Sequence, residues 1–141
     1  MAANARTLRH LRHLPLFSAC SKKDLERIAR AGDETMLASG TTMIRQGDVG
    51  REAFILLSGK ATVKRGGKRV ATLGAGAVVG ELSLFDHGPR TATVVCETDC
   101  HVLVLSQRHF LGLLDRVPAL AHKLFASLAT RIRDLDRAYL G

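Results

Sequence analysis

The chain has 141 residues, 46% of them hydrophobic and 24% charged, which is the size and composition of one ordinary globular domain. Its net charge of +8 would suit an anionic partner, but with 4% aromatic residues and no tryptophan it offers no platform for stacking nucleic-acid bases. No apolar run approaches the ~20 residues that cross a bilayer, and residues 1–12 lack a secretory signal. We therefore expect a cytoplasmic protein with no membrane span.

Residues 1–33 are predicted to form an N-terminal helical segment. Within residues 8–16, leucines at positions 8, 11 and 14 recur at helical spacing, and Pro15 then ends the pattern. A second helix should follow, because Ser21 can cap its start, Asp24 stands at the capping-box position and Gly32 offers an end.

From residue 34 to residue 105 the pattern changes to short strands separated by glycines. The expected strands cover residues 36–37, 40–44, 53–57, 60–64, 69–73, 91–96 and 100–105. The pair Gly66-Gly67 predicts a tight hairpin turn. Strands of this length and spacing predict a small antiparallel barrel or sandwich, so the expected fold class is α+β.

The segment 80–93 combines an acid, an arginine and a short helical turn. Gly80 follows an apolar run and allows the chain to turn sharply, and residues 82–86 are long enough for one helical turn. The first N–H groups of such a turn lack partners and attract an anion. Arg90 stands at the entry of the next strand, where its planar guanidinium can face the same space and bind phosphate.

Glu81 would repel a phosphate, so its position makes sense only if it accepts hydrogen bonds from hydroxyl groups. The segment therefore predicts a ligand that carries both a phosphate and a sugar hydroxyl. The alternative is an ordinary β-turn in which Glu81 and Arg90 form a surface pair.

No catalytic set is expected. Ser83, Asp86 and His87 contain the atoms of a hydrolase triad, but they crowd into one turn and no G-x-S-x-G elbow is present. We therefore predict that the protein is not an enzyme.

No metal site is expected either. The three cysteines, at positions 20, 96 and 100, are interpreted as free thiols. Cys96-x-x-x-Cys100-His101 lacks the two separated ligand pairs of a zinc site, and His10 with His13 lacks a third ligand.

Residues 106–141 are predicted to form two helices. Ser106 can cap a helix over residues 107–116, and Pro118 is well placed to begin the last one. One face of that last helix is marked by Leu120, Leu124, Leu128, Ile132, Leu135 and Tyr139. This apolar stripe fits packing against the strands and equally fits the seam of a homodimer.

The residues Gly80-Glu81-Leu82-Ser83, followed by Pro89-Arg90-Thr91-Ala92, resemble the phosphate-binding cassette of the cyclic nucleotide-binding domain family. The resemblance extends over about residues 14–135. It implies an antiparallel β-roll, a jelly-roll-like double-stranded β-helix, with N-terminal helices and a C-terminal helical lid. It also implies one domain over residues 1–141, with the helical segment at 1–33, the β-roll at 34–105, the cassette at 80–93 and the last helices at 106–141.

The resemblance assigns roles within the cassette. It implies that Glu81 contacts the ribose 2′-hydroxyl of a cyclic nucleotide and that Arg90 grips the cyclic phosphate. Backbone amides near Leu82 and Ser83, with the Thr91 hydroxyl, would complete the phosphate cradle. The ligand-binding residues implied are Gly80, Glu81, Leu82, Ser83, Arg90, Thr91 and Ala92.

Contacts to the base depart from the family pattern. Bacterial gene activators of the family place a Thr-Ser pair of the last helix against adenine, and this chain has Leu135-Asp136 there. The candidates for base or lid contacts are Arg131 and Leu135, with Arg133 as a further arginine on this helix. Thr91 is compatible with guanine in some relatives and with phosphate binding in many bacterial ones, so both cAMP and cGMP are candidates, with cAMP favoured.

Two functions remain open. The first is a regulatory sensor in which cyclic nucleotide closes the last helix and thereby changes a homodimer, a fused domain or an effector protein. The second is a scaffold or dimerisation module that keeps the β-roll without useful ligand affinity. Gene activators of the family carry a helix-turn-helix after this helix, whereas this sequence stops at Gly141, so no direct DNA binding is expected.

Overall fold

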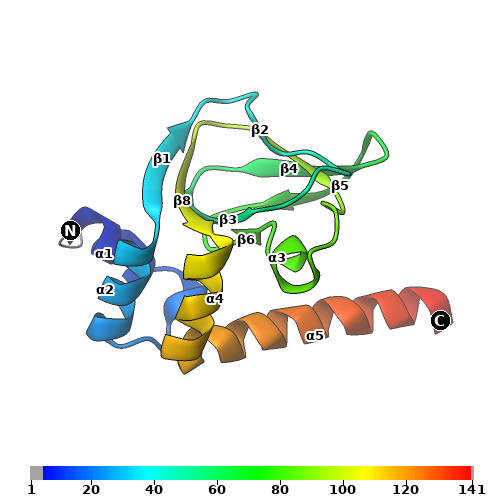
Figure 1. Cartoon of the computed structure of the whole chain (residues 1–141). Coiled ribbons are helices and arrows are strands. Elements are labelled where there is room, and N and C mark those ends of the chain that lie inside the picture. The colour runs from blue at the N-terminus through cyan, green and yellow to red at the C-terminus, as the bar shows by residue number, and fades with distance from the viewer. Residues whose placement is uncertain (1–4, 141) are drawn as a thin grey trace.

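The strands form two four-stranded antiparallel sheets, with orders β1-β8-β3-β6 and β2-β7-β4-β5 (Figure 1). This computed structural model describes residues 5–140, with side chains described up to residue 136. The strands are β1 (Asp33–Leu37), β2 (Thr42–Ile44), β3 (Glu52–Ser58), β4 (Ala61–Arg65), β5 (Lys68–Leu73), β6 (Val78–Val79), β7 (Thr93–Cys96) and β8 (Cys100–Ser106). Apart from the β4–β5 hairpin, neighbours in each sheet are distant in sequence, so the chain passes repeatedly from one sheet to the other, as a β-roll requires. The α+β prediction is confirmed.

The strand prediction was wrong at one place that matters for the site. The strand expected over residues 91–96 begins only at Thr93, so Thr91 and Ala92 lie in the connection that precedes β7. Arg90 pairs with the loop after β2 instead, because its backbone N–H donates to Asp48 O at 2.8 Å and its carbonyl accepts from Gly47 N at 2.9 Å. These two bonds take the arginine out of the sheet and hold it against the loop.

The helices begin and end close to the residues that the sequence predicts. They are α1 (Ala5–Arg12), the 3-10 turn η1 (Pro15–Phe17), α2 (Lys22–Ala31), α3 (Leu82–Asp86), α4 (Gln107–Arg116) and α5 (Pro118–Leu140). The capping box of α2 is confirmed, with Ser21 Oγ accepting from Asp24 N and Asp24 Oδ2 accepting from Ser21 N, both at 3.1 Å. Gly32 ends this helix in an extended conformation, and an added Cβ there would lie 2.8 Å from Val104 O.

Strand β3 is buried on both faces and separates two hydrophobic clusters. Ala53, Ile55 and Leu57 belong to the cluster beneath the helices, whereas Phe54 and Leu56 belong to the cluster between the two sheets. Because side chains alternate along a strand, one continuous apolar run supplies both clusters. The sheet that contains β3 is therefore held rigidly between a helical layer and the second sheet.

Helix α5 packs only over its first part. Leu120 and Leu124 are 1% and 3% exposed, whereas Ile132 and Leu135 are 59% and 60% exposed. Figure 1 shows α5 leaving α4 and running past α3 toward the C-terminus. The apolar stripe of the last helix thus divides into a packed part and an open part; the side chain of Tyr139 lies outside the described residues.

The three cysteines are free thiols, as predicted. Within the described part of the chain, no three His, Cys, Asp or Glu side chains gather closely enough to hold a metal ion. No helix among the described residues has both the length and the apolar character needed to cross a bilayer.

Candidate functional site

A cavity of about 680 Å³ opens between the second sheet, the segment 76–83 and helix α5. All the binding residues expected from the sequence line this one cavity, namely Gly80, Glu81, Leu82, Ser83, Arg90, Thr91, Ala92, Arg131 and Leu135. Arg133 also lies on α5 but is not among the lining residues. The fold therefore brings the cassette and one face of the last helix together around the same space.

Arg90 is a buried cation held by neutral acceptors. It is 7% exposed, and its Nη1 and Nη2 donate to the backbone carbonyls of Gly80 and Glu52, each at 2.7 Å. Burial lowers the pKa of the guanidinium from its ordinary value, while the nearby carboxylates of Glu52, Glu81 and Asp48 raise it and offset this only in part. An arginine stays protonated under such a shift, so the site holds a desolvated positive charge in a fixed orientation.

Two glycines make room for this guanidinium. At Gly50 an added Cβ would lie 2.6 Å from Ser83 Cβ and 2.7 Å from Arg90 Cζ. Gly80 adopts φ +82, and an added Cβ there would meet Arg90 Nη1. Gly80 is predicted at the site from the sequence, whereas Gly50 is not, because its only signal is its position at the end of the glycine-containing loop 46–50.

Glu81 is paired with the last helix. The residue is 3% exposed, and its Oε1 accepts a hydrogen bond from Arg131 Nη2 at 2.8 Å, while the Arg131 side chain is 50% exposed. The surface-pair alternative is wrong, because Glu81 and Arg90 are both buried and each has partners of its own. The ion pair instead connects the cassette directly to α5.

Helix α3 places its first turn at the cavity and its last turn against α4. Ser83 and Leu84 are 3% and 1% exposed. At the other end, His87 takes a left-handed conformation with φ 57, and Gln107 Nε2 lies 3.2 Å from His87 Nδ1 and 3.0 Å from Leu84 O. The side chain of Asp86 accepts from Gly88 N at 2.8 Å, so neither Asp86 nor His87 is engaged with Ser83 as a catalytic triad would require. The Gln107 contact was not predicted, because no local pattern connects Gln107 with Leu84, 23 positions earlier.

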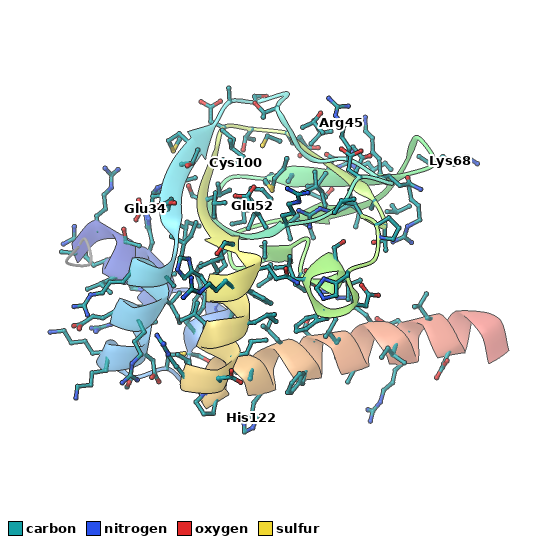
Figure 2. All side chains as sticks on the ribbon, viewed as in Figure 1. Glu34, Arg45, Glu52, Lys68, Cys100 and His122 are labelled. Atoms are coloured by element: carbon teal, nitrogen blue, oxygen red, sulfur yellow. The ribbon has the colours of Figure 1, made fainter. Side chains whose placement is uncertain are left out.

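The rest of the cavity is mostly apolar. Its walls come from the second sheet and from the inner face of α5, through Ile44, Val63, Val70, Ala71, Leu73, Val94, Leu124, Leu128, Ile132 and Leu135. Thr91 lies between this region and Arg90, and its carbonyl accepts from Arg65 Nε at 3.2 Å. Figure 2 shows Lys68 at the tip of the β4–β5 hairpin, whose strands contribute part of the apolar wall. An apolar wall beside one buried, fixed cation is typical of a cavity that binds a small molecule.

The chain resembles proteins of known class over most of its length. The Cyclic AMP receptor protein of Thermus thermophilus is 34% identical over 127 residues, which are 86% of this chain and 59% of that protein. A cAMP-dependent protein kinase regulatory subunit of Hypocrea atroviridis is 28% identical over 127 residues, 89% of this chain and 28% of that protein. The crystal structure of the Thermus thermophilus Catabolite Activator Protein matches with a TM-score of 0.81 at 33% identity, covering 89% of this chain and 61% of that one.

The chain thus spans less than two thirds of the length of each of these relatives. A family model described as Cyclic nucleotide-binding domain matches residues 34–117. The matched segment contains α3, α4 and nearly all of both sheets, and the chain therefore belongs to the cyclic nucleotide-binding domain family.

Proposed function

We propose that this chain binds a cyclic nucleotide in the cavity and acts as a regulatory sensor, with cAMP favoured over cGMP. The observation that carries the proposal is Arg90, a buried cation whose two guanidinium partners are neutral carbonyls. The nearby carboxylates of Glu52, Glu81 and Asp48 favour this charge, but its hydrogen bonds go to the two carbonyls, so its remaining N–H donors can bind an anionic ligand. The names of the relatives, a cyclic AMP receptor protein and a cAMP-dependent kinase regulatory subunit, support cyclic nucleotide as that anion, and the family is regulatory rather than catalytic.

In this proposal the cyclic phosphate binds Arg90 and the start of α3. Two of the five N–H donors of Arg90 are used by the carbonyls of Gly80 and Glu52, which fix the plane of the guanidinium and leave its other donors for the ligand. The amides of Leu82 and Ser83, in the first turn of α3, and the Thr91 hydroxyl supply further donors to the phosphate.

The ribose and the last helix would share the carboxylate of Glu81. Arg131 occupies Oε1, so Oε2 remains to accept the 2′-hydroxyl of the nucleotide. The same side chain would then contact ligand and α5 together, which gives the nucleotide a different affinity for the closed and open positions of the helix. The exposed Ile132 and Leu135 line the cavity, and a bound base would cover apolar surface that is otherwise left in water.

The apolar wall supports the preference for cAMP. Guanine carries both a carbonyl and an amino group that lose their water partners on burial, and each needs a replacement hydrogen bond. Of the residues that line the base region, most are aliphatic, with Arg65 of β4, Thr91, and Ser127 and Arg131 of α5 as polar exceptions. Adenine leaves fewer polar groups to satisfy in such a site.

The proposal also includes the partner that responds to ligand binding. Exposed Phe125, which is not among the cavity-lining residues, gives α5 apolar surface for a homodimer or for an effector protein or fused domain, and no metal ion is required. A cytoplasmic location is supported by the three free cysteines, because thiols persist where the compartment is reducing.

Calorimetric titration with cAMP and cGMP tests the proposal. The wild-type chain and an Arg108→Ala variant, which removes an exposed arginine of α4, should both bind with saturation, and Arg90→Ala should not. If a folded wild-type chain gave no heat with either nucleotide, the scaffold or dimerisation module would become the better description.

A further inference from the structure

The end of α3 that faces away from the cavity is bound by a side chain of α4. Gln107, the first residue of α4, directs its Nε2 at Leu84 O, 3.0 Å away, and at His87 Nδ1, 3.2 Å away. This one side chain therefore holds both the last turn of α3 and the residue that ends it.

Helix α3 needs such a partner because it is only five residues long. The carbonyls of a short helix have few intrahelical donors, and those that are buried must find partners elsewhere. Leu84 is 1% exposed, so Gln107 supplies a donor to a carbonyl that water reaches poorly. Loss of this donor would leave a buried carbonyl unsatisfied.

The orientation of the Gln107 amide follows from the two contacts. A carbonyl oxygen only accepts, so the group that faces Leu84 O must be the NH₂ of the amide. The same nitrogen faces His87 Nδ1, which therefore acts as the acceptor. His87 is the one non-glycine residue with positive φ in the described part of the chain, and this bond helps to hold it there.

Gln107 is itself anchored next to the other end of the phosphate site. Its backbone N–H donates to Arg51 O at 3.0 Å, and the next residue, Glu52, supplies the carbonyl that fixes Arg90 Nη2. Ser106, which precedes it, caps α4 by accepting from His109 N at 3.2 Å. The position of Gln107 is therefore set by the same strand end that positions Arg90.

A second contact joins the same two helices. The rings of Phe85 and Phe110 meet edge to face, with centroids 5.8 Å apart. Phe110 follows Gln107 by three positions, so both lie on the face of α4 that is turned to α3. Helix α4 in turn packs against α5.

We propose that Gln107 is a positioning residue that couples the phosphate-binding turn to α4, and through α4 to α5, without touching the nucleotide. This inference rests on the proposed function and goes beyond it by naming the route between the phosphate and the last helix. A phosphate bound at the start of α3 would tend to shift this helix. Because Gln107 is bonded to the end of α3, the helix can shift only together with the first turn of α4, or with the loss of both Gln107 hydrogen bonds.

The test uses substitutions that separate the donor from the size of the side chain. Gln107→Leu removes the donor, Gln107→Glu keeps the shape but places a carboxylate oxygen against Leu84 O, and Gln107→Lys retains a donor. We expect cAMP affinity to fall about tenfold in the Leu and Glu variants, as the loss of one buried hydrogen bond predicts, and to recover in large part with Lys. His109→Leu, an exposed change in the same turn of α4, is the matched control and should bind as wild type does.

A double-mutant cycle distinguishes coupling from a local structural role. If Gln107 connects α3 to α5, the loss in cAMP affinity caused by Arg131→Gln should shrink in the Gln107→Leu background, because the hydrogen bonds from α4 to α3 are already lost and only the contact between Phe85 and Phe110 remains. Additive losses, or an unchanged affinity in Gln107→Leu, would overturn the inference while leaving cyclic nucleotide binding intact.

Hydrogen exchange on the nucleotide-free chain gives a readout that does not depend on the ligand. Gln107→Leu should speed exchange of the amides in residues 82–88, whereas His109→Leu should not. Unchanged exchange in that segment would show that the link does not hold α3, whatever the nucleotide titration gives. A wild-type chain that binds neither nucleotide would remove the proposed function, and the exchange result would still decide whether the link exists.

Discussion

Glu81 and Arg131 form an ion pair with 2.8 Å between Oε1 and Nη2, although 50 positions separate them in the sequence. The carboxylate is nearly fully buried, whereas the guanidinium side chain is half exposed. The pair therefore fixes one point of α5 over the cavity and at the same time occupies part of the acceptor that a ribose would use.

Removal of Arg131 should destabilise the nucleotide-free chain. Arg131→Gln leaves the buried carboxylate of Glu81 without its cation, and we expect the free energy of unfolding in denaturant to fall by about 1–2 kcal/mol, less than for a fully buried pair because Arg131 is half exposed. The double variant Arg131→Gln/Glu81→Gln should recover much of the lost free energy of unfolding, because it no longer buries an unpaired carboxylate. The control Arg133→Gln, on the same helix but outside the cavity lining, should change stability by less than about 0.5 kcal/mol. If Arg131→Gln and Arg133→Gln lowered the free energy of unfolding equally, the ion pair would not be the cause of the loss.

Arg90 should carry most of the phosphate affinity. Because the guanidinium is desolvated and fixed by two carbonyls, Arg90→Ala should cost on the order of 3 to 5 kcal/mol of cAMP binding, about a hundredfold to several thousandfold. Arg90→Lys should recover only part of the loss, because an ammonium lacks the planar fork. Calorimetric or competition titration measures both variants, and an Arg90→Ala chain that binds as wild type does would place the phosphate elsewhere.

Glu81 should determine selectivity for the sugar. If its free oxygen accepts the ribose 2′-hydroxyl, Glu81→Ala should narrow the preference for cAMP over its 2′-deoxy analogue. The measurement is the ratio of the dissociation constants for the two nucleotides in each protein. A loss of affinity that affects both nucleotides equally therefore leaves the ratio unchanged. Unchanged discrimination would remove Glu81 from this role.

Gly50 should be required for the geometry of the arginine. In Gly50→Ala the new methyl group would lie 2.6 Å from Ser83 Cβ and 2.7 Å from Arg90 Cζ, so either α3 or the guanidinium must shift. We expect a loss of stability of about 1–3 kcal/mol, together with cAMP binding weaker by more than about tenfold. Gly74→Ala is the matched control, because an added Cβ there meets nothing within 4 Å and the backbone has no positive φ. Normal affinity in Gly50→Ala would show that the close packing is not needed.

Cys96 should make the fold less stable at high pH. Burial, helped by the neighbouring Cys100, raises the pKa of the Cys96 thiol from its ordinary value of 9.0 to about 11. Between these values the unfolded chain releases a proton that the folded chain retains, so the stability contribution present below pH ~9 is lost as pH rises toward ~11. Cys96→Ala should flatten this part of the pH profile of unfolding free energy. A profile with the same slope in both proteins would contradict the assignment.

The local features of the site could be predicted from the sequence because they depend on near neighbours. Gly80, Glu81 and the turn over residues 82–86 lie within a few positions of one another, and α3 spans the expected residues. The caps at Ser21 and Ser106 were equally predictable, since a helix cap involves residues three positions apart. Strand periodicity and glycine spacing predicted a small antiparallel barrel or sandwich, and the β-roll itself was implied by the family resemblance.

The partners of the cassette could not be predicted in this way. Gly50 lies beside Arg90, Gln107 beside Leu84, and Arg131 beside Glu81 only because the strands pass between two sheets and α5 returns past α3. Arg131 was the candidate contact and Arg133 a further arginine two positions away, and the rotation of α5 decided that Arg131 lines the cavity.

The sequence by itself therefore determined which residues could bind a sugar phosphate and in which local turn they stand. Only the tertiary structure decided that Arg90 is buried against neutral carbonyls, and that the apolar stripe of α5 is packed at Leu120 and open at Ile132. The physical reason is that turns and caps form from short-range hydrogen bonds, whereas burial and charge pairing depend on which distant segments the packed sheets bring together.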